Sequence, residues 1–279
     1  MPATVGTDNS CVWQRLNGEV AVTKSLNAEP YDTDKARHTH YLQNYEEHFE
    51  KLLGKEIRLL ELGVYKGGSL LLWKDYFDRG LIVGLDLTRI ELNDSSGRIR
   101  TYCGEQQDTV LLDRIARETA PEGFDVIIDD CSHIGELTRV SFWHLFDNHL
   151  KPGGLYVIED WSTGYWDGWF DGVGLKRRAR FTHSPILFRF REKLARLYNS
   201  KAIERIPLAQ TFIVAIKKLI NRSQFQSHDY GLVGFIKELV DECGMADITR
   251  RDFGNPPERP SKFKKMEISP GQVFIVKAS

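Results

Sequence analysis

The sequence predicts a doubly wound α/β fold, in which helices cover both faces of a mainly parallel sheet. Short apolar segments alternate with helix-like segments between residues 57 and 158, a rhythm that is typical of repeated βαβ units. Two of these apolar segments, 124–128 and 155–158, end abruptly in carboxylates. A glycine-containing loop, which begins at Gly63, follows the apolar segment 57–62. Because the carboxyl ends of parallel strands meet at one edge of a sheet, a ligand site is expected there.

The elements follow in order from apolar periodicity and from capping and turn residues. An amphipathic helix is expected over residues 34–53, with its N-cap among Asp32, Thr33 and Asp34. The next elements are strand 57–62, helix 68–76, strand 81–85, strand 99–102, helix 109–118, strand 124–128, helix 136–150 and strand 155–158. The run Lys-Pro-Gly-Gly at 151–154 is expected to be the turn that leads into the last of these strands.

The C-terminal part of the sequence predicts one more helix and two strands. The helix covers residues 230–243 and has Gly244 as its C-cap, and the strands cover 248–253 and 273–276. A long Pro-rich loop from Asn255 onwards would join the two strands over the active site.

The chain divides into an N-terminal arm, residues 1–30, and one domain, residues 31–279, with an insertion at about 162–227. The insertion begins with aromatic residues, and residues 176–222 hold thirteen Lys and Arg against two Glu. The basic stretch fits either a helical lid or dimer contact, or the approach of an acidic or lipid-linked acceptor at a membrane surface.

Composition excludes several classes of protein. Hydrophobic residues make up 41% and charged residues 28%, as in soluble globular domains. The formal charge of −1 gives no reason to expect a nucleic-acid partner. No apolar run approaches the ~20 residues of a transmembrane helix, and the first residues do not resemble a secretory signal. The four cysteines are widely spaced, which argues against a zinc or disulfide scaffold and favours the cytoplasm.

The loop after the first strand favours S-adenosylmethionine as the cofactor. Glu61 stands where the dinucleotide fingerprint has its first glycine, and a carboxylate there would repel a pyrophosphate but attract a sulfonium and an ammonium. Asp86, at the end of the second strand, has the spacing of a ribose-binding carboxylate. The alternative is a glycine-containing βα turn in an unrelated α/β domain. The expected cofactor-binding residues are Glu61, Gly63, Tyr65, Gly67, Ser69, Asp86, Gln107, Asp108 and Asp129.

The ends of the last two central strands, 124–128 and 155–158, carry four carboxylates and one imidazole: Asp129, Asp130, His133, Glu159 and Asp160. Such a cluster suits a hard cation such as Mg²⁺ with a general base beside it. The alternatives are that the aspartates cap the next helix, that the Glu-Asp pair is a solvated loop, and that the histidine is structural.

These motifs together resemble the metal-dependent sugar O-methyltransferases, in particular the macrocin and mycinamicin deoxysugar enzymes and related actinobacterial glycan methyltransferases. The resemblance covers residues 32–160 well and the last strands loosely. It implies a Rossmann-like, seven-stranded class I methyltransferase sheet, mostly parallel with an antiparallel last strand and helices on both faces.

The resemblance also implies a reaction and roles for residues. A methyl group would pass from S-adenosylmethionine to a sugar hydroxyl of a glycan, glycolipid or glycosylated natural product. The residues that match the family's ligands for Mg²⁺, or another divalent cation, are Asp130, Glu159 and Asp160; His133 matches the general base. A homodimer is expected. The competing interpretations are a metal-dependent O-methyltransferase of catechols or other small phenols, and a non-catalytic cofactor-binding assembly partner.

Other residues remain open at this stage. Lys35, Tyr41 and Tyr45 are candidates to close over the cofactor, whereas His144 and His149 are expected to be structural. The aromatics from Trp161 to Phe170 would either stack on a sugar ring or anchor the insertion.

Overall fold

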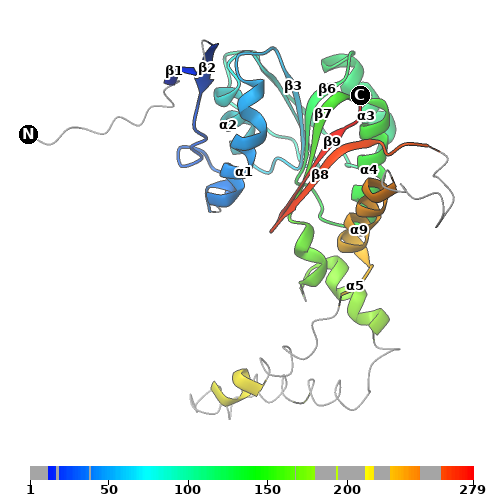
Figure 1. Cartoon of the computed structure of the whole chain (residues 1–279). Coiled ribbons are helices and arrows are strands. Elements are labelled where there is room, and N and C mark those ends of the chain that lie inside the picture. Colours follow the sequence, from blue (N-terminus) through cyan, green and yellow to red (C-terminus); the bar gives the residue numbers. More distant parts are fainter. Residues whose placement is uncertain are drawn as a thin grey trace, which may run out of the picture.

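The computed structural model describes residues 12–16, 19–37, 39–166, 168–179, 193, 211–216, 227–245 and 259–279. A seven-stranded sheet with the strand order β5-β4-β3-β6-β7-β9-β8 lies at its centre (Figure 1). Its strands are β3 (Arg58–Leu62), β4 (Leu81–Asp86), β5 (Ile99–Cys103), β6 (Phe124–Asp129), β7 (Leu150–Glu159), β8 (Phe263–Ser269) and β9 (Gln272–Lys277). Strands β1 (Val12–Leu16) and β2 (Glu19–Thr23) form a separate antiparallel pair.

The strand directions confirm the predicted sheet. Strands β3 to β7 run parallel to one another, whereas β9 is antiparallel to both of its neighbours, β7 and β8. Strands β3, β4 and β6 and the second half of β7, residues 155–159, are buried almost throughout, since helices cover both faces of the sheet.

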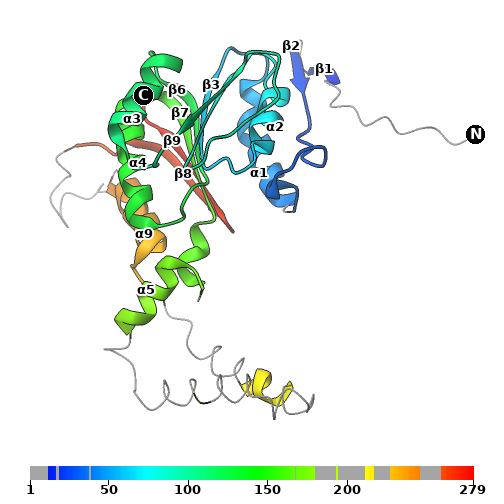
Figure 2. The same cartoon turned by 180° about the vertical axis from the view of Figure 1, so that it is seen from behind.

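Helices cover both faces of the sheet, as Figures 1 and 2 show from opposite sides. Helices α1 (Thr39–Phe49) and α2 (Gly68–Tyr76) pack on one face, and α3 (Thr109–Thr119), α4 (Gly135–Asn148) and α9 (Gly231–Gly244) on the other. Consecutive strand residues such as Leu59 and Leu60 belong to opposite cores, since side chains alternate along a strand. Further helical segments are η1 (Asp34–Arg37), η2 (Glu50–Leu52), η3 (Trp161–Tyr165) and α5 (Phe170–Ala179).

Three predicted elements differ from the structure. The helix expected over 34–53 is divided into η1, α1 and η2. The expected turn at 151–154 lies inside β7, where the pairing with β6 shifts register between Phe124 and Val126. Residues 263–269, expected to be loop, form β8, an edge strand whose exposed lysines hide its pattern. The predicted strand 248–253 lies outside the described residues.

The strand order places a topological switch point at the carboxyl ends of β3 and β6. The chain builds the sheet outward from β3 to β5 and then returns to β6 on the other side of β3, and such a switch point is where open α/β sheets bind ligands. Part of the expected N-terminal arm packs on this domain, because Leu26 and Ala28 are buried and Lys24 Nζ donates to Asp78 at 2.8 Å.

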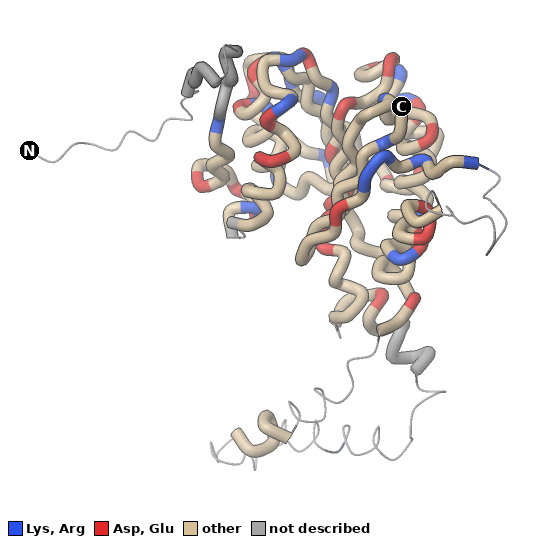
Figure 3. The backbone as a smooth tube through the Cα atoms, viewed as in Figure 1, with Lys and Arg blue, Asp and Glu red and all other residues tan. Residues whose placement is uncertain are grey.

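Two surface properties complete the description. Basic and acidic positions are interspersed over the described fold (Figure 3). Among the described residues, none of the helices combines the length and the apolar character that crossing a membrane requires.

Candidate active site

The glycine loop between β3 and α2 lies directly against the end of β6. Gly63 has a φ of +81°, and a Cβ at this position would lie 2.1 Å from the carbonyl oxygen of Asp130. The amide of Asp130 donates to the carbonyl of Leu62 at 2.9 Å. Only glycine satisfies both the backbone angle and this close approach, so the loop and the first catalytic candidate are fixed relative to each other.

Asp86 holds the same loop through hydrogen bonds to its backbone. Its Oδ2 accepts hydrogen bonds from the amides of Val64 and Tyr65, each at 2.9 Å, and its Oδ1 accepts two from Thr88 at 2.9 Å. Partial burial raises the pKa of Asp86, but the hydrogen bonds from Thr88, Val64 and Tyr65 outweigh it, and the pKa is lowered. The carboxylate is therefore held ionised at the sheet edge, with Tyr65 exposed beside it.

Glu61 lies behind the loop rather than on its surface. It is fully buried, and its Oε2 accepts a hydrogen bond from Ser69 Oγ at 2.7 Å. Its other oxygen is 3.5 Å from Lys35 Nζ. Burial raises the pKa of Glu61 even though Lys35 and Ser69 oppose this effect. Glu61 and Ser69 thus link the Gly63 loop to a buried cation.

That cation, Lys35, joins three carboxylates. It enters from η1 with 1% of its side chain exposed, and its Nζ is 2.7 Å from Asp130 Oδ2 and 2.9 Å from Glu159 Oε1. Burial alone would lower the pKa of Lys35, but Asp130, Glu159 and Glu61 raise it well above its ordinary value. Lys35 is therefore a buried and charged side chain.

Two tyrosines of α1 complete the contacts of the carboxylates. Tyr45 donates its hydroxyl hydrogen to Glu159 Oε1, and Tyr41 donates to Asp160 Oδ1 at 2.7 Å. The turn between β8 and β9 packs on Tyr41, because a Cβ on Gly271 would overlap the Tyr41 hydroxyl. Lys35, Tyr41 and Tyr45, which the sequence offered as a cover for a cofactor, contact the carboxylate cluster in this structure.

His133 lies at the open side of the cluster. Its Nε2 is 3.8 Å from Asp130 Oδ1, and one ligand atom each of Asp130, His133 and Asp160 lie within 4.8 Å of one another. His133 and Asp160 both have left-handed backbone, with φ of +52° and +50°. Such strain in non-glycine residues is concentrated at functional sites.

The three expected metal ligands, Asp130, Glu159 and Asp160, therefore do not all face the same point. Asp130 and Asp160 converge with His133, whereas Glu159 is buried against Lys35 and Tyr45. Burial is the main cause that raises the pKa of Asp130 and that of Glu159 to about 7 each, although Lys35 lowers both. Without a further cation, this pocket holds more acidic groups than one lysine can neutralise.

Asp129, next to Asp130, points to the opposite face of the sheet. Ser141 Oγ and Tyr156 OH donate to its Oδ2 at 3.0 and 3.2 Å, and Gln106 Nε2 lies 3.4 Å from its Oδ1. Burial raises the pKa of Asp129 to about 6. Gln106 also accepts a hydrogen bond from the amide of Ser132 at 3.0 Å, so it links Asp129 to the His133 loop.

The sequence prediction named the neighbours of Gln106 instead. Gln107 donates to the exposed Glu105 at 2.6 Å, and Asp108 is the N-cap of α3, accepting from the amides of Val110 and Leu111 at 3.1 Å. An Asp directly before an apolar periodic run is a capping signal that the sequence already contained. A part for Gln107 and Asp108 in cofactor binding stays a prediction.

Aromatic side chains border the open side of the site. The Trp169 ring lies 5.9 Å from the His133 ring, and its Nε1 donates to the carbonyl of Ser132 at 3.3 Å. Trp166 and Phe170 beside it are exposed. A cavity of about 470 Å³ lies next to this group, between the start of α4, α5 and the start of α9.

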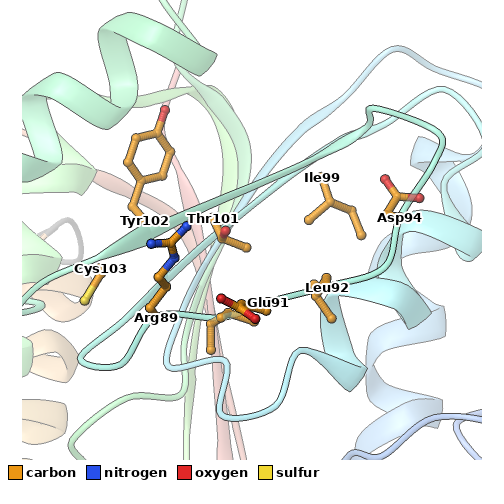
Figure 4. Close-up of a pocket in the computed structure, with 9 residues that line it drawn as sticks. Arg89, Glu91, Leu92, Asp94, Ile99, Thr101, Tyr102 and Cys103 are labelled. Atoms are coloured by element: carbon orange, nitrogen blue, oxygen red, sulfur yellow. The ribbon is translucent and has the colours of Figure 1, made fainter.

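A second cavity, of about 570 Å³, lies along the edge strand β5 under the loop that follows β4 (Figure 4). Arg89, Glu91, Thr101 and Cys103 contribute to its lining. None of the predicted site residues lines it.

Comparison with known proteins identifies relatives of this arrangement. The chain is 47% identical over 232 residues to mycinamicin VI 2''-O-methyltransferase of Micromonospora griseorubida, covering 80% of this chain and 54% of that protein. It is 44% identical over 135 residues to demethylmacrocin O-methyltransferase of Streptomyces fradiae, covering 46% of this chain and 33% of that protein. The chain thus spans about half the length, or less, of these relatives. No family model matches it.

Solved structures agree with the sequence relatives. The MycE methyltransferase of the mycinamycin pathway, in complex with Mg and SAH, superposes with a TM-score of 0.63 at 28% identity, covering 92% of this chain and 56% of MycE. The complex of MycE with Mg, SAH and mycinamycin VI gives a TM-score of 0.62 at 29% identity, covering 90% of this chain and 52% of MycE. The chain is therefore a relative of the deoxysugar O-methyltransferases and has the class I methyltransferase fold, as its motifs predicted.

Proposed function

We propose that the protein transfers a methyl group from S-adenosylmethionine to a sugar hydroxyl, with a divalent cation such as Mg²⁺ at Asp130 and Asp160. The observation that carries the proposal is the convergence of Asp130, His133 and Asp160 beside the Gly63 loop. The relatives support it, since their names give sugar-bearing natural products as acceptors.

The residues of the Gly63 loop and Asp86 fit the cofactor. The Gly63 loop and the start of α2 leave backbone close to the ligand space, and the ionised Asp86 lies at the end of β4. A ribose diol would replace the Thr88 contacts on Oδ1 while the loop contacts on Oδ2 persist. Glu61 and Ser69 would act from behind, by holding the loop.

The donor set also fits a hard cation. Asp130 and Asp160 supply oxygen ligands at the edge of the site, as Mg²⁺ requires. Burial raises the pKa of Asp130, and a bound cation would stabilise its ionised form. A bound cation would lower the pKa of a sugar hydroxyl that contacts it. Glu159, proposed as the third carboxylate, would reach the cation only by exchanging a contact with Lys35 or Tyr45.

His133 is the proposed general base. It lies on the open side of the cluster, with its ring facing Trp169, and a neutral imidazole there can accept the proton of an acceptor hydroxyl. The same position would also allow His133 to be the third metal ligand, because its Nε2 is among the three converging atoms. The metal preference separates these roles: an imidazole ligand favours Zn²⁺ or Co²⁺, and an all-oxygen site favours Mg²⁺.

Lys35 is a positioning residue in this proposal. It fixes the far oxygens of Asp130 and Glu159, and through Glu61 and Ser69 it connects them to the cofactor loop. The geometry of the metal ligands is thereby set by a protein cation. The acceptor would enter beside Trp169 and His133, where exposed aromatic rings can stack on the apolar face of a sugar.

The test is a methyl-transfer assay with S-adenosylmethionine, Mg²⁺ and acceptors that carry deoxysugars, compared with a panel of catechols. Methylation of a sugar that requires the metal and is lost in His133→Ala, while S-adenosylhomocysteine still raises the melting temperature, supports the proposal. Preference for catechols would overturn the sugar specificity. An intact cofactor shift with no turnover on either panel would favour the assembly-partner role. The homodimer, a peripheral membrane contact and a cytoplasmic location stay predictions.

A further inference from the structure

A second group of metal-ligand side chains lies at the other end of β6. His144 and His149, expected to be purely structural, both point their Nε2 atoms at Asp113 Oδ1, at 2.8 and 2.7 Å. One ligand atom from each of the three residues lies within 4.8 Å of the other two. Asp113 comes from α3, while both histidines come from the end of α4.

The backbone holds these three residues in place. His149 is the C-cap of α4 and donates its amide to Leu145 at 2.8 Å, while its carbonyl accepts from the first residue of β6, Phe124, at 2.7 Å. Its imidazole is therefore not needed to end the helix. The carbonyl end of α4 also favours a positive charge at this position.

The three side chains are partly exposed, which would allow a bound ion to exchange with solvent. The side chains of His144 and His149 are 19% and 18% exposed, and that of Asp113 is 47% exposed. The nearest lysine in the sequence, Lys151, is paired with Asp125 at 2.8 Å. The group therefore has one open side and three ligands that need to move by little to surround an ion.

We propose that Asp113, His144 and His149 form a surface site for a transition-metal ion of the Zn²⁺ type, separate from the site of methyl transfer. Two imidazoles and one carboxylate with an open fourth position suit Zn²⁺ or Co²⁺, whereas Mg²⁺ prefers oxygen alone. Since β6 rises about 3.3 Å per residue, the two sites are separated by roughly 17 Å. A bound ion would fasten α3 to the end of α4 and so stabilise the fold.

The experiment measures Zn²⁺ binding by calorimetry on full-length protein freed of metal, in an Asp130→Asn/Asp160→Asn background that removes the other cluster. Co²⁺ absorption reports the ligand geometry independently. The expected result is one bound ion per chain, with affinity reduced at least about tenfold in His144→Gln and in His149→Gln. His40→Gln, at an exposed histidine outside the group, is the matched control and should bind as its parent does.

Thermal unfolding provides the second measurement. Zn²⁺ should raise the melting temperature of the parent and of His40→Gln but not of His149→Gln. If His149→Gln does not fold, His144→Gln alone decides. The proposal is overturned if the background protein binds no Zn²⁺ at micromolar concentration, or if both glutamine variants bind as tightly as their parent. Because methyl transfer is not measured, failure here would leave the proposed function unaffected.

Discussion

Asp129 and Asp130 are neighbours at the end of β6, yet they lie in opposite environments. Asp129 faces α4 and contacts three neutral donors, Ser141, Tyr156 and Gln106. Asp130 faces α1 and η1 and contacts the buried cation Lys35, with His133 on its open side. Burial raises the pKa of both carboxyls, to about 6 and about 7. Burial therefore disfavours the charged form of both aspartates. Hydrogen bonds from neutral groups offset this effect at Asp129, and an ion pair with Lys35 offsets it at Asp130.

The difference separates a carboxyl with neutral internal partners from one that we propose to be a metal ligand. Ser141 and Tyr156 donate to Asp129, so this carboxyl connects β6, β7 and α4. The cluster around Asp130 instead combines Asp130, Glu159 and Glu61 around one lysine, and excess negative charge is what a divalent cation would neutralise. Under the proposed function, Asp129 belongs to the framework and Asp130 to the metal site.

The largest expected effect is the loss of turnover on substitution of Asp130. Asp130→Asn should lower kcat by at least about 100-fold, because the Lewis acidity of a bound metal is worth several kcal/mol and each 1.36 kcal/mol is tenfold. Methyl transfer at saturating acceptor, with Mg²⁺ titrated, measures the loss. S-adenosylhomocysteine binding should persist. The comparison fails if Asp129→Asn weakens Mg²⁺ affinity more than Asp130→Asn does.

The next effect tests the lysine that distinguishes the two faces. Lys35→Met should lower the free energy of unfolding by about 3–5 kcal/mol, since removing one partner of a buried ion pair leaves charges uncompensated. Denaturant unfolding in EDTA measures it. The matched control is Lys66→Met, which removes a lysine whose partner Asp32 is exposed and should change stability little.

A double variant separates charge from packing in this result. Lys35→Met combined with Glu159→Gln should recover part of the lost stability, because one buried charge is then removed with its partner. Equal stability of the single and double variants would mean that Lys35 acts mainly through packing.

Sequence reasoning was strongest where local patterns decide the structure. The bounds of α2, Gly68–Tyr76, and the starts of β4, β5 and β6 agree with the prediction, since glycine turns and continuous apolar runs are local signals. β8 was not predicted because an exposed edge strand carries no continuous apolar run. The bulged start of β7 depends on pairing with β6, which is not visible in one segment.

The candidate site shows the same limit more sharply. The carboxylates and His133 were found because they end strands, but the role of Lys35 depends on contacts 95 residues away in sequence. Gln106 and Gln107 differ only in which side of the chain they face, and that side is fixed by the loop after β5. Long-range pairing and orientation, rather than residue type, decided these points.

A further prediction concerns Asp129 and the pH dependence of the free energy of unfolding. Because the pKa of Asp129 is about 6 in the folded protein against an ordinary 3.8, the folded state binds this proton more tightly than the unfolded state. Its contribution to stability is present below about pH 4 and is lost as the pH rises through 6. A shift of this size corresponds to about 3 kcal/mol.

Asp129→Asn should remove that dependence. The fall in the free energy of unfolding between pH 4 and pH 7.5, measured in urea with EDTA, should be smaller than in the parent protein by up to about 3 kcal/mol. The raised pKa values of Asp130 and Glu159 affect both proteins alike. An unchanged pH profile would show that Asp129 titrates normally and would weaken the contrast between the two faces.

The smallest expected effects come from two tyrosines, one on each face. Tyr156→Phe removes a 3.2 Å hydrogen bond to Asp129 and should lower the free energy of unfolding by about 0.5–1.5 kcal/mol, with Mg²⁺ affinity unchanged. Tyr41→Phe removes a 2.7 Å hydrogen bond to Asp160 and should weaken Mg²⁺ binding by about tenfold or more, as for other residues that orient a ligand. Urea unfolding and Mg²⁺ calorimetry on both variants give the full comparison. If Tyr156→Phe reduced the metal affinity, or Tyr41→Phe left it unchanged, the proposed division between Asp129 as a framework residue and Asp130 with Asp160 as metal ligands would fail.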